Sequence, residues 1–507
     1  MTPSELAAEA QPSVPVHCQD LGALPVLDPG AWRSQLMARV RAGARPLTVY
    51  GRPHDDRVLI TAVLLGEAGL ALLRTSVNPA GGYHELTSEI PALHCFEREL
   101  HETLGVRVAG HPWQKPIRYQ GKDQAAMNAY PFYRIEGKEL HEVNVGPIHA
   151  GVIEPGAFRF TCFGEQVLHL EIHLGFQHRG AEARLLAEAT RQPLSPRRMA
   201  PLVETLAGDT SAAHAWAHAA ALEALAGAPA PAAHERARAI ALELERAAMH
   251  LAGLSGLAAD VGFLPGASTY GRLRTTAINT SMRLCGSRFS RGAIRPFAQP
   301  LRGGAELTAL VRKNLELLRA DLALVNEAFL SSRLVRHRLA GVGTVTADTA
   351  RQLGLVGMAA RASGVAVDVR APGRGVFAAP ALPVCTEPAG DCLARARLRI
   401  TELAASLDWL TAVYADEAAA PAETEATTPA APALRPGHLA IALVEGWRGE
   451  VVHCLETDER GAIVHCKVQD PSLRNWMGLA MAVRGNEISD FPICNKSFDL
   501  SYCGNDL

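Results

Sequence analysis

The sequence contains no continuous apolar stretch of the roughly 18 residues that a membrane-spanning helix requires. The longest candidate, VLITAVLLGEAGLALL from Val58, is interrupted by Gly66, Glu67 and Gly69. The first residues, MTPSELAAEAQPSVPVHC, lack a basic start followed by an apolar run, so we expect no secretory signal. A cytoplasmic location is therefore the default expectation.

Neither sign of charge is in excess. The 50 Lys and Arg residues face 52 Asp and Glu residues, which gives a net charge of -2. Such a balance offers no broad attraction to nucleic acid or to an anionic membrane. No glycine-rich loop with the phosphate-binding pattern occurs either, so the sequence predicts neither a nucleotide site nor an NAD site in this chain.

The chain also lacks the CxxC spacing with which one loop presents two thiolates to a metal. Its ten cysteines are scattered: Cys18, Cys95, Cys162, Cys285, Cys385, Cys392, Cys454, Cys466, Cys494 and Cys503. In a reducing compartment they are expected to be free thiols, most of them small core residues.

The first part of the chain has the pattern of a small α/β domain, residues 1–140. A helix is predicted around 32–42, followed by short apolar runs (PLTVYG, VLITAVLL, LALLRTSV and YHELTSEI) that indicate a meandering sheet. A second helix is predicted over 95–104, because Gly105 is a typical residue after a helix end.

The second part, residues 143–507, predicts a large, mainly helical domain, so the fold class is α+β. An extended run from Phe158 precedes helices predicted over 233–257, 306–330 and 391–414. Residues 415–437 are rich in Ala and Pro and predict a flexible insertion. The alternating segment after it, centred on DERG, predicts a β-hairpin.

Several short motifs concentrate reactive side chains. GFQHRGAE places His178, Arg179 and Glu182 where an extended run passes into a helix. The arginine could direct its charge at an anionic cofactor or at a partner's metal cluster, or the cluster could simply satisfy a helix start. EGWRGE brings Arg448 and Glu450 onto one loop, which is either an interface loop or a salt-bridged turn.

Two motifs, HLEIH from His169 and HAWAH from His214, place pairs of histidines four residues apart. That spacing aligns both rings on one face of a helix, and also of a strand. No fitting Glu or Cys accompanies them as a third ligand, so ordinary histidines are the favoured interpretation over a zinc site.

Together, these stretches resemble a specific family. FERELHETLGVRVAGHPWQKPIRY from Phe96 is similar to the smaller peripheral-arm subunit of respiratory complex I. NVGPIHAGVIEPGAFRF, GFQHRGAE, LELERAAMHLAGLSGLAADVGF, ASGVAVDVR, EGWRGE and the tail FDLSYCGNDL resemble, in order, its large catalytic-arm subunit and the large subunits of membrane-bound nickel-iron hydrogenases. Both halves in one chain resemble the large subunits of hydrogenase-4 and formate hydrogenlyase.

The resemblance implies roles for three side chains near a cluster or cavity: Arg179, His178 and His149. In the family the arginine of the HRG motif lies beside the terminal iron-sulfur cluster of a small partner subunit. A cation there would stabilise the reduced, more negative cluster and raise its potential. The likeness implies no cluster held by this chain.

The metal-ligand cysteines of the hydrogenases are missing. Registering the family pattern on this sequence places Ala207 and Thr210 at two cysteine positions, and Ser501 and Gly504 at the other two. A methyl group and a hydrogen cannot coordinate nickel, and hydroxyl groups are poor ligands for a soft site. The sequence therefore predicts no nickel-iron centre. Cys503 falls one place short of the last ligand position.

The residues of quinone reduction in complex I are also altered. Gly208 occupies the position of its tyrosine and Ile153 that of its histidine, while the earlier His149 of the loop is kept. A quinone remains a possible ligand, although the complex I mechanism is not supported. No catalytic residue can be assigned from the sequence.

The leading prediction is a cytoplasmic-side subunit of a hydrogenase-4-like or NADH-quinone oxidoreductase-like electron-transfer complex. It would pack against an iron-sulfur small subunit and reach the inner face of the cell membrane through antiporter-like membrane-arm subunits. Two alternatives stay open: an active quinone oxidoreductase or hydrogenase subunit with a rearranged site, and a non-catalytic scaffold. No nucleic-acid partner is expected.

Overall fold

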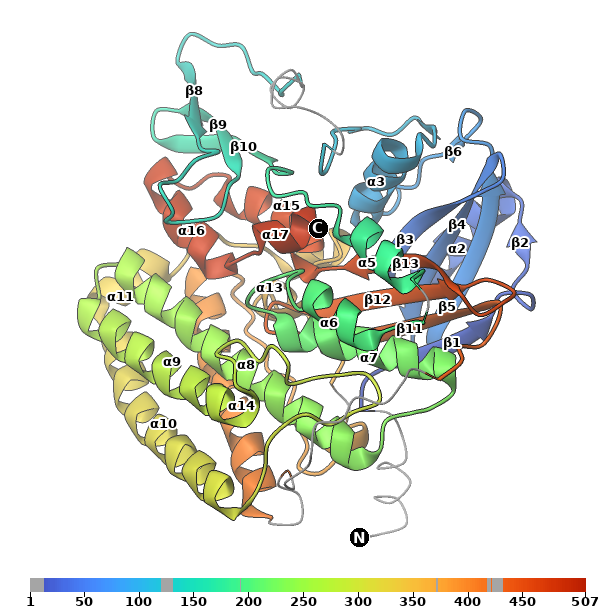
Figure 1. Ribbon diagram of the computed structural model, residues 1–507. Helices are drawn as coiled ribbons and strands as arrows, with labels where there is room; N and C mark the ends of the chain where they lie inside the picture. The colour runs from blue at the N-terminus through green and yellow to red at the C-terminus, as the bar shows by residue number, and fades with distance from the viewer. Residues whose placement is uncertain (1–12, 120–130, 192, 371–372, 417–420, 422–431) are drawn as a thin grey trace.

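The computed structural model describes residues 13–119, 131–191, 193–370, 373–416, 421 and 432–507 (Figure 1). Over these residues the chain is a mixed α+β protein, as predicted, with four separate sheets among the described strands. Most of the predicted flexible insertion, 415–437, lies outside the described residues. Its last part is held in place, because Leu434 is buried and the Arg435 N–H donates to the Leu225 carbonyl.

The first layer is a four-stranded sheet with the order β2-β5-β4-β3. Its strands are β2 (Val26–Leu27), β3 (Arg45–His54), β4 (Arg57–Gly66) and β5 (Gly69–Val77). Strands β3, β4 and β5 form the predicted antiparallel meander, whereas β2 pairs in parallel with β5.

The strand expected from Tyr83 onward is cut short. Only β6 (Tyr83–His84) forms, and it pairs in parallel with β7 (Val108–Ala109). The next backbone N–H groups, those of Leu86 and Thr87, donate to the buried carboxylate of Glu97 at 2.9 and 3.0 Å. A side chain therefore replaces the neighbouring strand as the hydrogen-bond partner.

Apolar side chains of helices α2 (Pro29–Arg41) and α3 (His94–Leu104) pack against the four-stranded sheet. Asp28 caps α2 by accepting hydrogen bonds from the N–H groups of Gly30 and Ala31. Gly105 ends α3 with a φ of 64°, as its sequence predicts. Trp32 and Phe96, one from each helix, are fully buried in the resulting core.

A second sheet, with the order β1-β11-β12-β13, packs face to face on the first. Its strands are β1 (Val16–Asp20), β11 (His438–Glu445), β12 (Glu450–Thr457) and β13 (Ile463–Gln469). Strand β1 belongs to the predicted domain 1–140, yet it pairs with β11 of the predicted domain 143–507. Both faces of the central strands of these two packed sheets are covered. Their sequences are therefore continuous apolar runs, such as VLITAVLL in β4 of the first sheet, rather than alternating ones.

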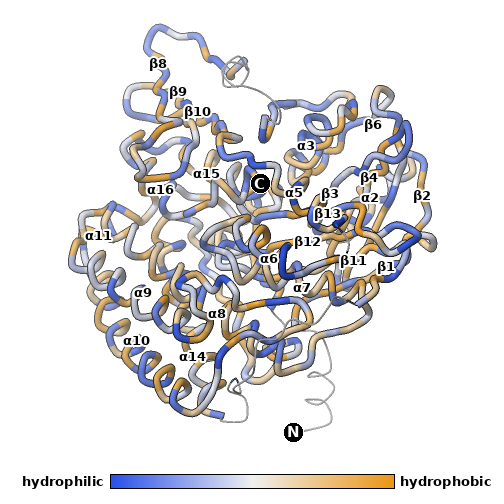
Figure 2. Tube along the Cα trace, in the orientation of Figure 1, coloured by the Kyte–Doolittle hydropathy of each residue, from blue (hydrophilic) through white to orange (hydrophobic). Residues whose placement is uncertain are grey.

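Helices cover the far side of the second sheet. Helix α7 (Ser211–Ala226) packs on β11 and β12, and a bundle of α8 (Ala232–Asp260), α9 (Leu264–Cys285), α10 (Ala305–Ser331) and α14 (Cys392–Ala415) lies beyond it. Figure 2 shows hydrophobic and hydrophilic residues alternating along these bundle helices. Three of the four match the predicted ranges. Helix α9 was not predicted, because its sequence is rich in Thr, Ser and Gly.

The remaining helices and strands complete the fold (Figure 1). They are β8 (Leu140–Val145), β9 (Ala157–Phe163), β10 (Gln166–His173), α5 (Ala181–Ala189), α6 (Pro196–Val203), α11 (Arg333–Leu339), α12 (Ala347–Gln352), α13 (Gly357–Arg361), α15 (Pro471–Val483), α16 (Phe491–Phe498) and α17 (Tyr502–Asp506). None of the described helices combines the length and the apolar character needed to cross a bilayer.

Two glycines with positive φ test how tightly α13 packs on the β11–β12 turn. A Cβ at Gly357 would lie 2.1 Å from the Arg448 carbonyl oxygen, whereas a Cβ at Gly286 would meet nothing within 4 Å. We expect Gly357→Ala to lower the free energy of unfolding by about 3 kcal/mol and Gly286→Ala by about 1 kcal/mol, in urea titrations. Equal losses would contradict the close packing.

Candidate functional site

The four positions that the resemblance assigns to the hydrogenase metal ligands lie on two segments that meet inside the protein. Ala207 and Thr210 are on the loop between α6 and α7, and Ser501 and Gly504 are at the start of α17. All four are buried. The Cys503 thiol, between the two tail positions, lies 3.3 Å from the Ser501 hydroxyl. Arg448 hydrogen-bonds to both segments, so they lie side by side.

Arg448 ties these two segments together. Its guanidinium donates to both carboxylate oxygens of Asp209, at 2.6 and 2.7 Å, and to the Thr210 hydroxyl at 3.2 Å. Its Nε donates to the carbonyl oxygen of Asp499 in the tail. Although burial opposes ionisation, the Arg448 charge lowers the pKa of Asp209. A bidentate ion pair thus occupies the centre of the former ligand loop.

The side chains present do not fit a nickel-iron centre. The Ser501 hydroxyl caps α17 by accepting the Gly504 N–H at 2.9 Å. A Cβ at Gly504 would lie 2.6 to 2.8 Å from the carboxylate of Asp470, so that carboxylate fills the space of a side chain there. Ala207 offers only a methyl group. Among the described residues, no group of three or more His, Cys, Asp and Glu side chains is arranged to hold a metal.

Asp470 begins a line of buried polar groups. Its carboxylate lies 3.1 Å from Nε2 of His214, whose Nδ1 lies 3.1 Å from Nε2 of His453. The ring of His218 follows, 5.7 Å from that of His453. Burial lowers the pKa of His218 to about 4 and holds that of His453 well below its usual range, so both imidazoles are neutral near pH 7. The HAWAH motif therefore supplies two rings of one polar chain.

A cavity of about 630 Å³ lies beside these segments. Its walls come from the loop of the GPIH motif, the end of α8, α16 and the tail, and its polar wall residues include His149, Asp260, Lys496, Asp499 and Tyr502. Burial raises the pKa of Asp260, with Lys496 opposing the shift. Most of the remaining lining is apolar, so the cavity suits an apolar molecule with a polar end.

The loop at the rim of this cavity exposes unusual apolar surface. Ile148 is 87% exposed and Val152 is 83% exposed. His149, between them, is fixed by a hydrogen-bond contact of 2.6 Å between its Nε2 and the carbonyl oxygen of Gly156. Exposed apolar side chains on an ordered loop are typical of a surface that another protein or a membrane covers.

The HRG motif packs against the tail. The carbonyl oxygen of Leu507 accepts the Arg179 N–H at 2.9 Å, and the His178 ring lies 2.7 Å from the Asp506 carbonyl oxygen. The Arg179 guanidinium donates to the carbonyl oxygens of Thr205 and Leu206, at 2.8 and 3.0 Å. Arg179 is exposed and makes no ion pair with a carboxylate in the described part of the chain. Its charge is available to a neighbour.

The predicted interface loop faces inward instead of outward. Arg448 and Glu450 are only 5% and 1% exposed. Glu450 accepts hydrogen bonds from Arg45 of β3 and from Arg474 of α15, the latter at 2.8 Å. Burial requires that such charges be paired within the chain, and the Arg45–Glu450 pair joins the two predicted domains. Contact of this loop with a partner stays a prediction.

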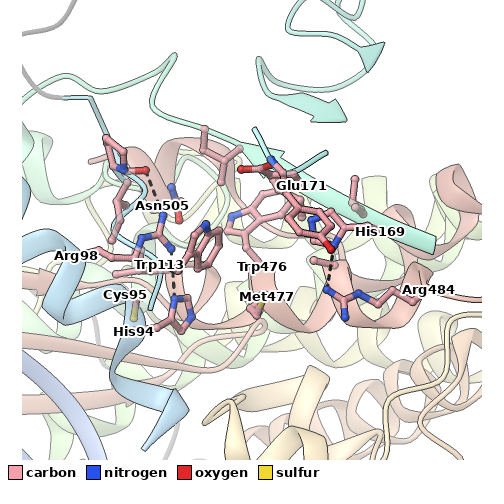
Figure 3. Close-up of a pocket in the computed structure, with 18 of the residues that line it drawn as sticks. His94, Cys95, Arg98, Trp113, His169, Glu171, Trp476, Met477, Arg484 and Asn505 are labelled. Atoms are coloured by element: carbon pink, nitrogen blue, oxygen red, sulfur yellow. Dashed lines mark hydrogen bonds between the residues drawn. The ribbon is translucent and has the colours of Figure 1, made fainter. Parts of the chain in front are cut away.

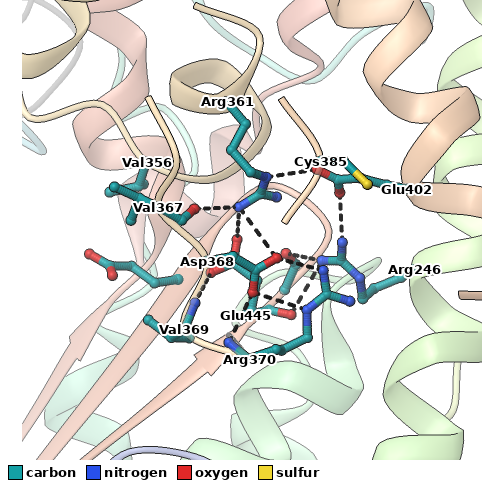
Figure 4. A network of polar contacts seen from close by, with 12 residues as sticks. Arg246, Val356, Arg361, Val367, Asp368, Val369, Arg370, Cys385, Glu402 and Glu445 are labelled. Atoms are coloured by element: carbon teal, nitrogen blue, oxygen red, sulfur yellow. Dashed lines mark hydrogen bonds and ion pairs between the residues drawn. The ribbon is translucent and has the colours of Figure 1, made fainter. Parts of the chain in front are cut away.

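Sequence reasoning missed the largest buried charge cluster, which lies between the bundle and β11 (Figure 4). Its members are Arg246, Arg361, Arg370, Glu243, Glu402, Glu445 and Asp368. Arg361 bridges Glu402 and Glu445 at 2.7 and 2.6 Å. The close spacing of Glu243 with Arg246, and of Asp368 with Arg370, was the available signal.

This cluster holds one more carboxylate than guanidinium groups. Burial raises the pKa of Glu445 to about 7, despite the opposing charge of Arg361. In Glu402, by contrast, the charge of Arg361 and the contact with His250 overcome burial and hold the pKa well below its usual range. Of these two carboxyl groups, Glu445 is therefore the one that holds a proton up to about pH 7.

A second cavity, of about 490 Å³, lies between α3, β10 and α15 (Figure 3). Arg98 and Arg484 are at opposite ends of this view. The Arg98 guanidinium lies 4.1 Å from the ring centroid of Trp113, and Arg484 donates to Nδ1 of His169 at 3.1 Å. The HLEIH motif is thus the strand β10, and His169 serves an ordinary structural contact.

Comparison with known proteins identifies relatives. The family described as respiratory-chain NADH dehydrogenase, 49 Kd subunit, matches residues 260–435. Formate hydrogenlyase subunit 5 of Escherichia coli (strain K12) is 27% identical over 453 residues, which cover 84% of this chain and 77% of the relative. Hydrogenase-4 component G of the same organism is 26% identical over 450 residues, 84% of this chain and 76% of the relative.

A further relative comes from a respiratory enzyme. NADH-quinone oxidoreductase subunit 4 of Thermus thermophilus (strain ATCC 27634) is 28% identical over 392 residues, which cover 72% of this chain and 94% of the relative. These similarities confirm the resemblance that the ordered motifs indicated.

The Arg448–Asp209 pair can be tested by removing its carboxylate. Asp209→Ala leaves the buried guanidinium with neutral acceptors only. Because the Asp209 side chain is 35% exposed and partly solvated, we expect a loss of about 2 kcal/mol in the free energy of unfolding by urea titration. Asp408→Ala, which breaks an exposed pair with Arg319, should cost less than about 1 kcal/mol. Similar losses would contradict the role of burial.

The proton on Glu445 predicts a pH dependence. A carboxyl group whose pKa is raised from 4.5 to about 7 on folding stabilises the protein at acidic pH, and that stability is lost as the pH rises through 7. As the pH rises from 5 to 8, we expect the free energy of unfolding of Glu445→Gln to increase by about 2 kcal/mol relative to that of the unmodified protein, as measured by urea titrations. Glu459→Gln, at an exposed turn, is the control and should leave the pH profile unchanged.

Proposed function

We propose that this chain, a relative of membrane-bound hydrogenase large subunits and of the respiratory-chain NADH dehydrogenase 49 kDa subunit family, is a subunit of a membrane-bound electron-transfer complex. It packs against an iron-sulfur small subunit at the surface that carries Arg179. The supporting observation is the exposed Arg179 guanidinium, which backbone carbonyl groups hold in place and no described carboxylate neutralises.

The complex works without a nickel-iron centre in this chain. The positions of the four hydrogenase ligands are occupied by a methyl group, two engaged hydroxyl groups and a glycine packed against Asp470. The segments around them instead form ion pairs and hydrogen bonds that close the tail against the α6–α7 loop. We expect metal analysis of the purified complex to find iron from the partner's cluster and no stoichiometric nickel, and stoichiometric nickel would overturn this proposal.

A second candidate function, reduction of a quinone, is favoured by the cavity of about 630 Å³. Its apolar walls suit a quinone ring and the first part of an isoprenoid tail, and His149, Asp260 and Tyr502 offer polar contacts to a carbonyl oxygen. Quinone-dependent turnover that His149→Ala abolishes, in a complex that still assembles, would support this function. Unchanged turnover would exclude His149 from it.

The role of Arg179 predicts a change in a redox potential. One elementary charge about 10 Å from a cluster, at an effective dielectric constant of about 20, alters the potential by about 70 mV. We expect Arg179→Met to lower the midpoint potential of the partner's nearest iron-sulfur cluster by this amount, as measured by electron paramagnetic resonance in a redox titration of the intact complex.

The control for this measurement is Arg333→Met, which removes another exposed arginine, on α11, far along the chain. It should leave the potential unchanged. If Arg179→Met also leaves it unchanged while the two subunits still copurify, the proposed placement of the cluster beside Arg179 is wrong.

A further inference from the structure

Two buried cysteines from distant parts of the chain meet beneath one glycine. Cys392 is the first residue of α14 and Cys494 lies in α16, and both have an exposed fraction of 0%. A Cβ built on Gly343 would lie 2.7 Å from Sγ of Cys494 and 3.3 Å from Sγ of Cys392. Both sulfur atoms thus border the same point beside Gly343. They form a dithiol site that spacing in the sequence could not indicate.

A buried arginine adjoins this pair. Nη2 of Arg395 donates to Sγ of Cys392 at 3.4 Å, and the other guanidinium contacts, each 2.8 Å, are with neutral oxygens of Ser497, Gly390 and Gly343. Arg395 is fully buried and has no carboxylate partner within 4 Å among the described residues. A buried cation without an anion is costly, so the thiolate form of Cys392 is favoured as its counterion.

The other charged groups near the pair leave this arrangement intact. The carboxylate of Asp391 is engaged by the N–H groups of Gly341 and Ala394, both at 2.7 Å, and Asp490 lies on the Cys494 side. Burial alone would raise the pKa of Cys392, but the Cys494 thiol and the Arg395 charge lower it to about 6. The first turn of α14 adds its positive dipole end.

Only a thin turn separates the sulfur atoms from solvent. Gly343 has a φ of 65° and no side chain, and its neighbours Gly341 and Thr344 are exposed. A local opening of this glycine turn exposes the dithiol to a molecule of the size of water or hydrogen peroxide without unfolding of either helix.

We propose that Cys392 and Cys494 are an oxidation site for small hydroperoxides, at which a thiolate and a thiol become a disulfide that joins α14 to α16. The Cys392 thiolate attacks the O–O bond, forms a sulfenic acid and releases hydroxide, which takes up a proton to give water. The Cys494 sulfur then attacks the sulfenic sulfur, and the hydroxyl group leaves as a second water. Two thiols and one hydrogen peroxide thus give one disulfide and two waters.

The consequence is a cross-link at the base of the tail. Helix α16 ends at Phe498, immediately before Asp499, whose carbonyl oxygen accepts a hydrogen bond from Arg448. A bond between α14 and α16 therefore restricts the segment that closes both the cavity and the former ligand loop. The inference is independent of the proposed electron-transfer function, because it rests on the two thiols and Arg395.

The test is peptide mapping of the full chain after treatment with equimolar hydrogen peroxide at pH 7. Remaining thiols are blocked with N-ethylmaleimide in denaturant before non-reducing digestion and mass spectrometry. We expect a peptide linked through Cys392 and Cys494 as the main product, with an initial rate that falls at least fivefold between pH 7 and pH 5 as the thiolate is protonated.

Matched variants distinguish this site from general oxidation. Cys392→Ser and Cys494→Ser should each abolish the linked peptide, whereas Cys466→Ser, at another buried thiol whose pKa is raised by burial, should leave it unchanged. Near-ultraviolet circular dichroism checks that each variant is folded. The proposal is overturned if the unmodified protein yields no linked peptide, or if Cys392 is oxidised to a sulfinic acid while Cys494 remains free.

Discussion

The need to neutralise buried charge is the constraint on which the rest of this structure depends. Arg361 leaves α13 with no exposure to solvent and joins Glu402 of the bundle to Glu445 of the second sheet. Breaking a buried pair of this kind costs about 3–5 kcal/mol, because the remaining charge has no partner. The bundle and the sheet are therefore fixed relative to each other at the point where β11 turns into β12, and that turn carries Arg448.

The same rule explains the contacts between the α6–α7 loop and the tail. Arg448 is only 5% exposed there and must be paired. Asp209 and the carbonyl oxygen of Asp499 satisfy it, and Asp470 pairs with His214 on the other side of Gly504. Paired polar side chains therefore hold these two segments together.

Local patterns in the sequence were sufficient for three of the four bundle helices, α8, α10 and α14, and for the meander β3 to β5, because an amphipathic stripe and turn residues specify them. The strand pairing of β1 with β11 joins residues more than 400 positions apart, and no local pattern carries that information. For the site, the resemblance brought the α6–α7 loop and the tail together. The resemblance could not identify the partners of Asp470 and Asp209, because the pairing of these carboxylates depends on the side chains that surround them in three dimensions.

The tail also connects the HRG motif to the buried polar chain that starts at Asp470, two features that lie far apart in the sequence. The α17 segment is only five residues long, yet its far end accepts the N–H group of Arg179 while Gly504 packs against Asp470. The Asp506 carboxylate further accepts the N–H groups of Gly175 and Gln177, at 2.9 and 2.8 Å. So short an element, bonded at both ends, links the HRG segment directly to the buried polar chain that starts at Asp470.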